Sequence, residues 1–331
     1  RSAPRLQVRR ILDHPVPGGG SAHVLDQKAV VLAGVADDEL GGLPSGARAV
    51  YASAYDEKMH PGLGPAAEAD LLYVRQLKIP ERIRASGEQF VVWDIGLGAA
   101  ANAVAVLRAT RDIPCPLRLV SFDNTAEPLA FALENAGALG YVREYEEQLQ
   151  TILNRREVRF INGASTVTWE FHLDDFPTWL ERRAPARPVS YNEPQRAEPV
   201  LGAPHAILFD AFSPAKNPAM WTLPLFTNLF RSLDPQRPCN LTTYSRSTMF
   251  RVTLLLAGFF VGRGVATGVK EETTVAANTL ELIDTPLDGK WLERARRSGN
   301  AEPLHKPVYS QSPLSTENWE RLRAHPQFHQ P

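Results

Sequence analysis

The chain has 331 residues, of which 44% are hydrophobic and 22% charged, and its formal net charge is −1 at pH 7. This is the composition of an ordinary globular protein, and the charge excludes a surface that coats nucleic acid by electrostatics alone. No run of about 18 apolar residues is present, so we expect no membrane span. Cys115 and Cys239 fit neither a disulfide framework nor a metal site, which favours a reducing cytoplasm without a bound metal. We expect a monomer, because no additional apolar patch stands out.

Residues 1–85 are expected to form a small β-rich N-terminal subdomain. Apolar and alternating residues predict short strands over Val24–Val35 and Ala49–Ala54, separated by a glycine-rich turn. A polar, turn-rich segment at 55–65 leads into a helix predicted over Ala66–Leu77. The subdomain therefore ends in a helix, before the pattern of the chain changes.

Residues 86–331 are expected to form one α/β domain. Its apolar strands alternate with helices in this order: strand 90–95, helix 99–110, strand 117–122, helices 128–138 and 142–156, strands 158–161 and 167–171, helix 176–183, strand 205–209, helix 224–233, strand 240–244, helix 247–257. Such alternation predicts a doubly wound, mostly parallel sheet. An antiparallel closing pair is predicted over 259–269 and 275–283, and a last helix over 316–324. The proline-rich segment 184–204 indicates a surface insertion.

Acidic residues and a glycine lie at the ends of several predicted strands. Parallel strands joined by right-handed connections end at one edge of the sheet, and open α/β sheets bind their ligands at that edge. We therefore expect one rim to carry Asp94, Gly96, Asp123, Asp174 and Asp210.

The first part of this rim suits a nucleoside. Gly96-Leu-Gly98 lets the backbone approach a ligand before a helix N-terminus, although a tight turn alone also explains these glycines. Asp123 can accept both hydroxyl groups of a ribose, or it can simply cap the next helix. Asp174 can accept a hydrogen bond from an adenine amine and Asp175 competes for that role, while either can instead cap the helix that follows.

The loop Asp210–Trp221 follows an apolar strand and contains two prolines that fix its backbone. Its carboxylate at Asp210 is the candidate catalytic group. The loop also supplies the candidate acceptor-binding residues Phe212, Lys216, Asn217 and Trp221. A stiff structural turn with an aspartate cap remains the simpler alternative.

The predicted cofactor-binding residues, with Asp94 among them, suit a nucleoside that carries a carboxylate on its tail and no phosphate. S-adenosylmethionine is such a ligand. No phosphate-binding lysine follows the glycines, which excludes a P-loop, and Ala101 replaces the third glycine of a dinucleotide fingerprint. A nicotinamide dehydrogenase is further disfavoured because the second half of the domain offers no convincing catalytic histidine.

Three segments, Val91–Asn102, Leu119–Asp123 and Asp210–Trp221, resemble the methyltransferase domain of the bacterial MnmC type, and the last is the most specific. The resemblance runs from about residue 50 to residue 283. Residues ahead of the α/β domain that also match the family pattern are Glu57, His60, Gly64 and Glu68.

The resemblance implies a class I methyltransferase fold, which is Rossmann-like, with S-adenosylmethionine as methyl donor. It also implies the aminomethyl group of a tRNA wobble uridine as acceptor, with Glu57 and His60 on the acceptor side. The flavin-dependent half of the family lies outside the resemblance, so we expect a stand-alone methyltransferase. The chain departs from the family pattern at Met59, Pro61 and Ala99 and in its insertion at 184–204.

The expected reaction is an in-line transfer of a methyl group to a neutral primary amine, with Asp210 orienting the amine and taking its proton. Phe212 or Trp221 is expected to stack on the base. Candidate contacts to RNA phosphates are Arg246, Arg251, Arg294, Arg296 and Arg297. Three alternatives stay open: a small-molecule amine as acceptor, an aminopropyltransferase, and a non-catalytic protein that binds RNA or another partner through the same fold.

Overall fold

A computed structural model describes residues 24–26, 48–52, 57–58, 63–183, 202–267 and 271–329. His60 and most of the predicted insertion at 184–204 lie outside these ranges. The chain forms two compact units. Unit 1 comprises residues 1–90, 94–174 and 266–271, and unit 2 comprises residues 91–93, 175–265 and 272–331. The predicted division at residue 85 stays a prediction.

The small N-terminal sheet belongs to unit 1. Its strands β1 (Val24–Asp26), β2 (Arg48–Ala52) and β3 (Glu57–Lys58) pair in antiparallel fashion in the order β1-β2-β3. β2 confirms the strand predicted over Ala49–Ala54. β3 was not predicted, because two residues are too short for an alternating pattern to stand out.

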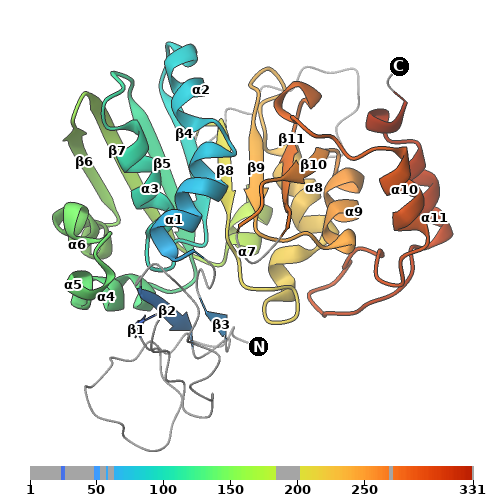
Figure 1. The fold of residues 1–331 in the computed structure, drawn as a ribbon, viewed down its shortest axis with the longest axis horizontal. Helices are drawn as coiled ribbons and strands as arrows, with labels where there is room; N and C mark the ends of the chain where they lie inside the picture. Colours follow the sequence, from blue (N-terminus) through green and yellow to red (C-terminus); the bar gives the residue numbers. More distant parts are fainter. Residues whose placement is uncertain are drawn as a thin grey trace, which may run out of the picture. The chain divides into compact units, whose positions relative to one another are not determined.

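The main sheet has eight strands in the order β10-β11-β9-β8-β4-β5-β7-β6 (Figure 1). Their bounds are β4 Phe90–Ile95, β5 Leu117–Asp123, β6 Glu157–Asn162, β7 Ser165–Leu173, β8 Ala206–Phe209, β9 Asn240–Thr243, β10 Phe260–Gly264 and β11 Thr273–Ala277. β5 runs parallel to β7 and β8 runs parallel to β9. β11 is antiparallel to both β9 and β10, which confirms the predicted closing pair. The sheet is thus the mostly parallel, doubly wound sheet that the sequence predicts.

The helices of unit 1 are α1 Pro65–Ala69, the π-helix η2 Asp70–Arg75, α2 Ile79–Ser86, α3 Ala101–Thr110, α4 Glu127–Glu134, α5 Ala136–Leu139, the 3₁₀ turn η3 Arg143–Tyr145 and α6 Glu146–Arg155. The helix predicted over Ala66–Leu77 is therefore half α-helical and half π-helical. α2, which follows it, was not predicted. The predicted helix at 128–138 is two helices that meet at Asn135, whose side chain bonds the Phe131 carbonyl.

The β6–β7 hairpin turns at Gly163, close to the predicted turn at Asn162-Gly163. Gly163 has φ +61, and a Cβ atom there would lie 2.5 Å from the Arg111 carbonyl oxygen. Ala164 donates its N–H to the same carbonyl at 2.8 Å. Glycine is needed here for both its backbone conformation and its lack of a side chain.

Unit 2 contains α7 Phe176–Glu181, the 3₁₀ turn η4 Pro218–Trp221, α8 Leu223–Arg231, α9 Thr248–Ala257, the 3₁₀ turn η5 Leu280–Leu282, α10 Gly289–Arg296, α11 Thr316–Arg323 and the 3₁₀ turn η6 Pro326–Phe328. α10 was not predicted. Its signal is Asp288, whose carboxylate accepts from the Trp291 N–H at 2.8 Å and caps the helix. No helix in the described ranges is long and apolar enough to cross a membrane.

Candidate active site

The glycine turn after β4 is bonded to the end of β5. The N–H groups of Gly96 and Leu97 donate to the Phe122 carbonyl at 2.9 and 3.0 Å. The N–H of Gly98 donates to Oδ2 of Asp123 at 2.9 Å. Both glycines have positive φ, 95 for Gly96 and 50 for Gly98. Gly96, Gly98 and Asp123, which sequence reasoning placed on one rim, are thus brought together within unit 1.

Asp123 carries a perturbed carboxyl group at this turn. Burial raises its pKa to about 6, although backbone N–H groups, those of Gly98 and Thr125 among them, lower it. The side chain is nevertheless partly exposed. Hydroxyl donors from a ligand would favour the ionised form, so a ribose would bring this group back toward its ordinary range. Asp123 therefore suits the role predicted for it, which is to accept hydrogen bonds from the hydroxyl groups of a ribose.

Asp94 lies within the strand that the sequence predicts at 90–95, but its side chain is not exposed at the rim of the sheet. It lies inside β4, and its side chain is fully buried. The hydroxyl of Ser121 donates to Oδ2 of Asp94 at 2.9 Å, and Nε1 of Trp169 donates to that same hydroxyl at 3.0 Å. This chain of hydrogen bonds links β4, β5 and β7 just below the glycine turn. A contact between Asp94 and the cofactor stays a prediction.

Tyr141 is a residue of this region that sequence reasoning missed. Its hydroxyl donates to the Ala99 carbonyl at 2.9 Å and fixes the turn from the other side. Burial raises the pKa of this hydroxyl well above its ordinary value, so it stays protonated and remains a donor. No local pattern signals this contact, because 42 residues separate the partners.

Asp174 and Asp175 follow β7 and divide their roles. Asp174 donates its N–H to the Asp123 carbonyl at 3.0 Å, which ties it to the end of β5. Asp175 caps α7: its Oδ2 accepts from the N–H of Thr178 at 3.1 Å and from that residue's hydroxyl at 2.6 Å. The structure thus bears out the capping alternative for Asp175. Asp174 remains the better candidate for contact with a ligand.

Unit 1 fits S-adenosylmethionine by the chemistry of its groups. It offers a partly exposed carboxylate at the end of β5, a turn in which both Gly96 and Gly98 have positive φ, and a second acid at the end of β7. A ribose diol and an adenine amine require acceptors of this kind. Among the described residues, no cluster of three or more metal-binding side chains is present.

The loop Asp210–Trp221 in unit 2 is held by aromatic side chains. Tyr244 donates its hydroxyl to the Ala211 carbonyl at 2.9 Å, and Trp221 donates Nε1 to the Phe212 carbonyl at 2.7 Å. These are the carbonyl groups of the two residues that follow Asp210. The backbone beside the predicted catalytic carboxylate is therefore fixed in place, and the side chain of Asp210 remains partly exposed.

Trp221 does not have the base-stacking position predicted for it. Its side chain is 0% exposed. The ring packs edge-on against Phe250 at 4.7 Å and against Phe209 at 5.4 Å between centroids. A base cannot reach a ring enclosed in this way, so Trp221 is a core residue that positions the loop. Phe212, which is partly exposed, is the aromatic residue of this loop that can meet a ligand.

The tip of the loop is a compact turn. The N–H groups of Lys216 and Asn217 both donate to the Ser213 carbonyl, at 2.9 and 2.8 Å. The Lys216 side chain is exposed and that of Asn217 partly exposed. Both stay candidates for contact with an acceptor.

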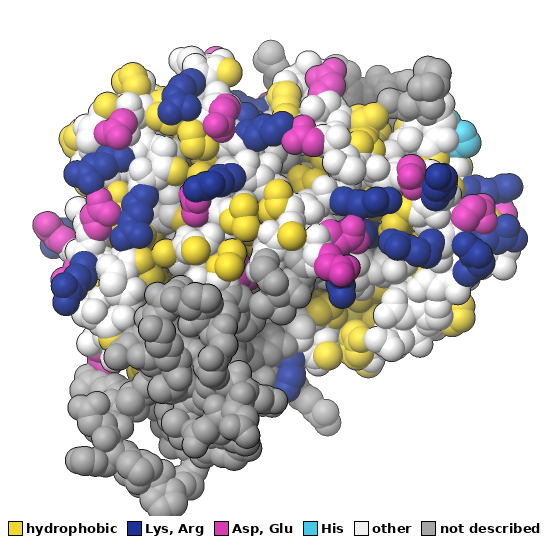
Figure 2. All heavy atoms as spheres, in the orientation of Figure 1, with side chains coloured by type: hydrophobic (Ala, Val, Ile, Leu, Met, Phe, Trp, Pro, Cys, Tyr) yellow, Lys and Arg dark blue, Asp and Glu magenta, His cyan; other side chains and the backbone are white. Residues whose placement is uncertain are grey.

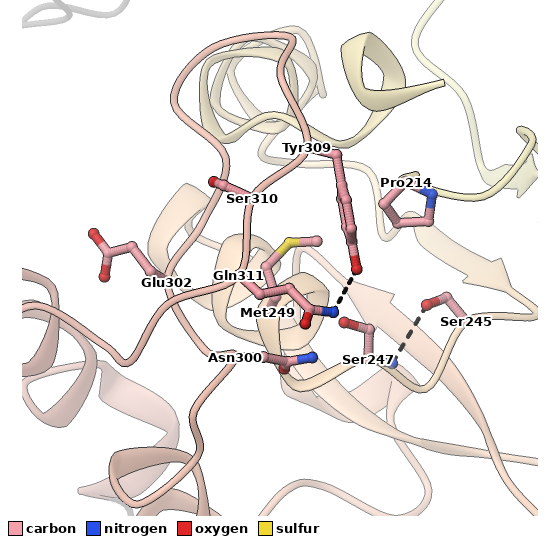
Figure 3. Close-up of a pocket in the computed structure, with 9 residues that line it drawn as sticks. All are labelled: Pro214, Ser245, Ser247, Met249, Asn300, Glu302, Tyr309, Ser310 and Gln311. Atoms are coloured by element: carbon pink, nitrogen blue, oxygen red, sulfur yellow. Dashed lines mark hydrogen bonds between the residues drawn. The ribbon is translucent and has the colours of Figure 1, made fainter. Parts of the chain in front are cut away.

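A pocket of about 200 Å³ lies beside this loop, entirely within unit 2 (Figure 3). Pro214 of the loop forms one wall. A second wall is formed by Ser245 and Ser247, which lie between β9 and α9, and by Met249 in the first turn of α9. The remaining wall comes from the segment between α10 and α11, which we call the C-terminal strap (residues 297–315). Sequence reasoning did not foresee this wall, because the strap lies far from the loop along the chain.

One predicted phosphate contact is excluded by burial. The Arg251 side chain is 1% exposed. Its guanidinium donates to the Thr274 hydroxyl at 3.0 Å, to the Thr273 carbonyl at 2.7 Å and to the carboxylate of Glu272 at 2.8 Å. Burial lowers its pKa, and Glu272 opposes that shift. Arg251 therefore joins α9 to β11, whereas Arg246 is exposed and remains a candidate.

The residues predicted ahead of the α/β domain are only partly described. Glu57 lies in β3. Glu68 lies in α1 and is buried, and its N–H donates to the Gly64 carbonyl at 2.9 Å. A role in binding an acceptor stays a prediction for Glu57 and His60.

Comparisons with known proteins agree with this geometry. A family model described as an S-adenosyl-L-methionine-dependent methyltransferase matches residues 199–279, which include the loop Asp210–Trp221. The chain is 30% identical over 237 residues to a tRNA 5-methylaminomethyl-2-thiouridine biosynthesis bifunctional protein MnmC from Cupriavidus metallidurans, which covers 68% of the chain and 32% of the relative. A protein of the same name from Aeromonas hydrophila is 38% identical over 218 residues, 62% of the chain and 30% of the relative.

The chain thus spans about a third of the length of these relatives. Among solved structures, MnmC2 from Aquifex aeolicus matches with a TM-score of 0.59 at 20% identity, covering 85% of this chain and 80% of that one. This likeness supports the fold. The family model, the relatives and the fold lead to one conclusion: the chain carries a class I, S-adenosylmethionine-dependent methyltransferase domain of the MnmC type.

Proposed function

We propose that the protein methylates the aminomethyl group of a modified uridine at the tRNA wobble position. The observation that carries this proposal is the loop Asp210–Trp221, which presents a partly exposed carboxylate on a backbone pinned by Tyr244 and Trp221. The relatives from Cupriavidus metallidurans and Aeromonas hydrophila are named for the biosynthesis of 5-methylaminomethyl-2-thiouridine in tRNA.

The residues of unit 1 hold the methyl donor. Asp123 accepts the ribose hydroxyls, Asp174 receives the adenine amine, and the turn at Gly96 and Gly98 lets the backbone approach the ligand. When bound, S-adenosylmethionine supplies an electrophilic methyl group on its sulfonium. The remaining contribution of the chain is to hold the acceptor and to exclude water.

The residues of unit 2 act on the acceptor amine. An amine attacks carbon only in its neutral form, so one proton must leave the nitrogen. In this proposal the Asp210 carboxylate accepts a hydrogen bond from the amine, orients its lone pair and receives that proton. Phe212, Lys216 and Asn217 contact the nucleotide.

Exposed basic side chains of unit 2 suit the phosphates of an RNA. Figure 2 shows Lys and Arg gathered over the part of the molecule that carries α10 and α11, with acidic side chains among them. Exposed basic residues lie on α10, directly after α10 and on α11: Lys290, Arg294, Arg296, Arg297, Arg321 and Arg323. Phosphate binding through such residues weakens as salt rises, so an affinity for tRNA that is independent of salt would contradict this part of the proposal.

Methylation assays on undermodified tRNA and on a panel of free amines test the proposal. The expected result is methyl transfer to tRNA alone. The Asp210→Asn variant should lose about 100-fold or more of kcat, because general acid–base groups contribute on that order, while its affinity for S-adenosylmethionine stays unchanged. Asp112→Asn, at an exposed position of unit 1, is the matched control.

Three outcomes would contradict the proposal in different ways. Transfer to free amines but not to tRNA would make the protein a small-molecule methyltransferase. Full activity of Asp210→Asn on tRNA would keep the substrate and remove Asp210 from its assigned role. A failure to bind S-adenosylmethionine, measured by calorimetry, would favour a non-catalytic binding protein.

A further inference from the structure

The pocket between Pro214 and the C-terminal strap is built on a rigid base. Leu304 accepts the Leu223 N–H at 2.8 Å, and the N–H groups of Ala301 and Glu302 donate to the Ser312 carbonyl at 3.0 and 3.1 Å. The Glu302 carboxylate accepts from Asn318 Nδ2 at 2.7 Å. The strap is therefore tied to both α8 and α11, while Tyr309 at its tip is 40% exposed.

The side chains around the pocket are neutral where they face it. Figure 3 shows the Tyr309 ring close to Pro214, with its hydroxyl directed toward Gln311 and Ser247. Gln311 donates Nε2 to that hydroxyl at 2.5 Å. Glu302, the charged residue among the described lining residues, points away from the pocket. A free phosphate or a bare ammonium ion would find no opposite charge here.

The chemistry of the pocket matches a small planar ring with polar edges. Its volume of about 200 Å³ lies below the roughly 300–1,000 Å³ of sites for drug-sized ligands. Pro214, Met249 and Tyr309 offer apolar and aromatic surface for ring faces. Gln311 carries both a carbonyl acceptor and an N–H donor, and uracil presents the matching set, an N–H between two carbonyl groups.

We propose that this pocket binds the uracil ring of the acceptor nucleotide, with Tyr309 against its face and Gln311 at its edge. The inference rests on the proposed function for the identity of the nucleotide. Pro214 and Asp210 lie on the same pinned loop, so a ring held against Pro214 is fixed in relation to the carboxylate. The C-terminal strap thereby selects the base, a role that the family match at residues 199–279 does not cover.

Nucleoside binding tests the pocket without requiring methyl transfer. The full chain, saturated with S-adenosylhomocysteine, is titrated with uridine, cytidine and adenosine and followed by NMR. Uridine should bind more tightly than the other two. Tyr309→Ala should weaken uridine binding about tenfold, because stacking on an aromatic ring contributes on that order for each base. Gln311→Leu should weaken uridine binding, because it removes both hydrogen-bonding groups at the edge of the ring.

Val308→Ala is the matched control, because Val308 lies next to Tyr309 on the strap, is 67% exposed and lines no part of the pocket. It should bind uridine as the wild type does. All variants should keep their affinity for S-adenosylhomocysteine, which establishes that they fold. With tRNA as substrate, Tyr309→Ala should raise KM about tenfold and leave kcat within about twofold.

The outcomes separate this inference from the proposed function. If the wild type does not bind uridine, or if Tyr309→Ala and Gln311→Leu bind it as the wild type does, the pocket is not a uracil site. If tRNA is methylated while KM is unchanged in Tyr309→Ala, the proposed function stands and the inference is overturned. If uridine binds in a Tyr309-dependent way but tRNA is not methylated, the pocket stands and the proposed function fails.

Discussion

The glycine turn of unit 1 and the loop Asp210–Trp221 of unit 2 both follow a buried strand, but they are held in different ways. The turn is bonded mainly to the end of the adjacent strand, through Phe122 and Asp123. The loop is held by the side chains of Tyr244 and Trp221, both anchored in the aromatic core. The turn thus depends mainly on the end of a neighbouring strand, whereas the loop depends on the packing of aromatic side chains within unit 2.

The electrostatic character of the two regions also differs. At the turn, burial raises the pKa of Asp123 to about 6, so its charge changes within an accessible pH range. The pocket beside the loop is lined by hydroxyl, amide and apolar groups, with its one acid turned outward (Figure 3). A titrating carboxylate suits a ligand that donates hydroxyl groups, and a neutral pocket suits a planar base.

The largest expected effect concerns the packing that holds the loop. Trp221→Ala should lower the free energy of unfolding by about 3–5 kcal/mol, because it leaves a cavity in the aromatic core. Trp221→Phe keeps most of the ring and loses the donor to the Phe212 carbonyl, so it should cost about 1–3 kcal/mol. Denaturant unfolding measures both values.

The same pair of variants tests whether the two regions are independent. Trp221→Phe should raise KM for the acceptor and leave the affinity for S-adenosylmethionine unchanged, because the turn of unit 1 does not rely on this ring. If Trp221→Phe weakened the affinity for S-adenosylmethionine by the same factor as it raised KM for the acceptor, the two regions would not be independent.

A smaller effect is expected from the titration of Asp123. Ligand hydroxyls bind its ionised form, so ligand binding lowers the pKa from about 6 and releases a proton. The affinity for S-adenosylmethionine should therefore fall about tenfold per pH unit as pH drops below about 6, and should be constant above it. Calorimetry between pH 4.5 and 8 in matched buffers measures this slope.

The Asp123→Asn variant provides the control for this titration. Its affinity for S-adenosylmethionine should be low and should not change with pH between about pH 5 and pH 6. A slope that persists in Asp123→Asn would assign the titration to another group. The unliganded wild type should show the opposite dependence in stability, because a raised carboxyl pKa favours the folded protein at low pH and this contribution is lost as pH rises through about 6.

The smallest effect is expected at Asp175. Asp175→Ala removes the cap of α7 and should cost about 1 kcal/mol of unfolding free energy. Its affinity for S-adenosylmethionine should stay at the wild-type value, whereas Asp174→Ala should lower that affinity. Loss of donor binding in Asp175→Ala, with stability unchanged, would restore the cofactor role for Asp175 and reject the capping assignment.

The sequence alone was sufficient for the frame of the fold. The strand Phe90–Ile95 and the alanine-rich helix after it were predicted almost to the residue, since a buried strand and a buried helix both require largely apolar stretches. The antiparallel closing pair followed from alternation. α2 and α10 were missed because their apolar residues are few and their caps are weak signals beside the turns around them.

For the site, the sequence predicted that the glycine turn and Asp123 share one edge of the sheet. The structure places Gly96, Gly98 and Asp123 close together, because neighbouring parallel strands end at the same level. Only the tertiary structure decided that Trp221 and Arg251 are buried, because the neighbouring sequence does not show whether a tryptophan or an arginine side chain lies in the core or on the surface. It alone brought Tyr309 of the C-terminal strap to Pro214, since contacts between residues so distant in sequence arise from packing and leave no local pattern.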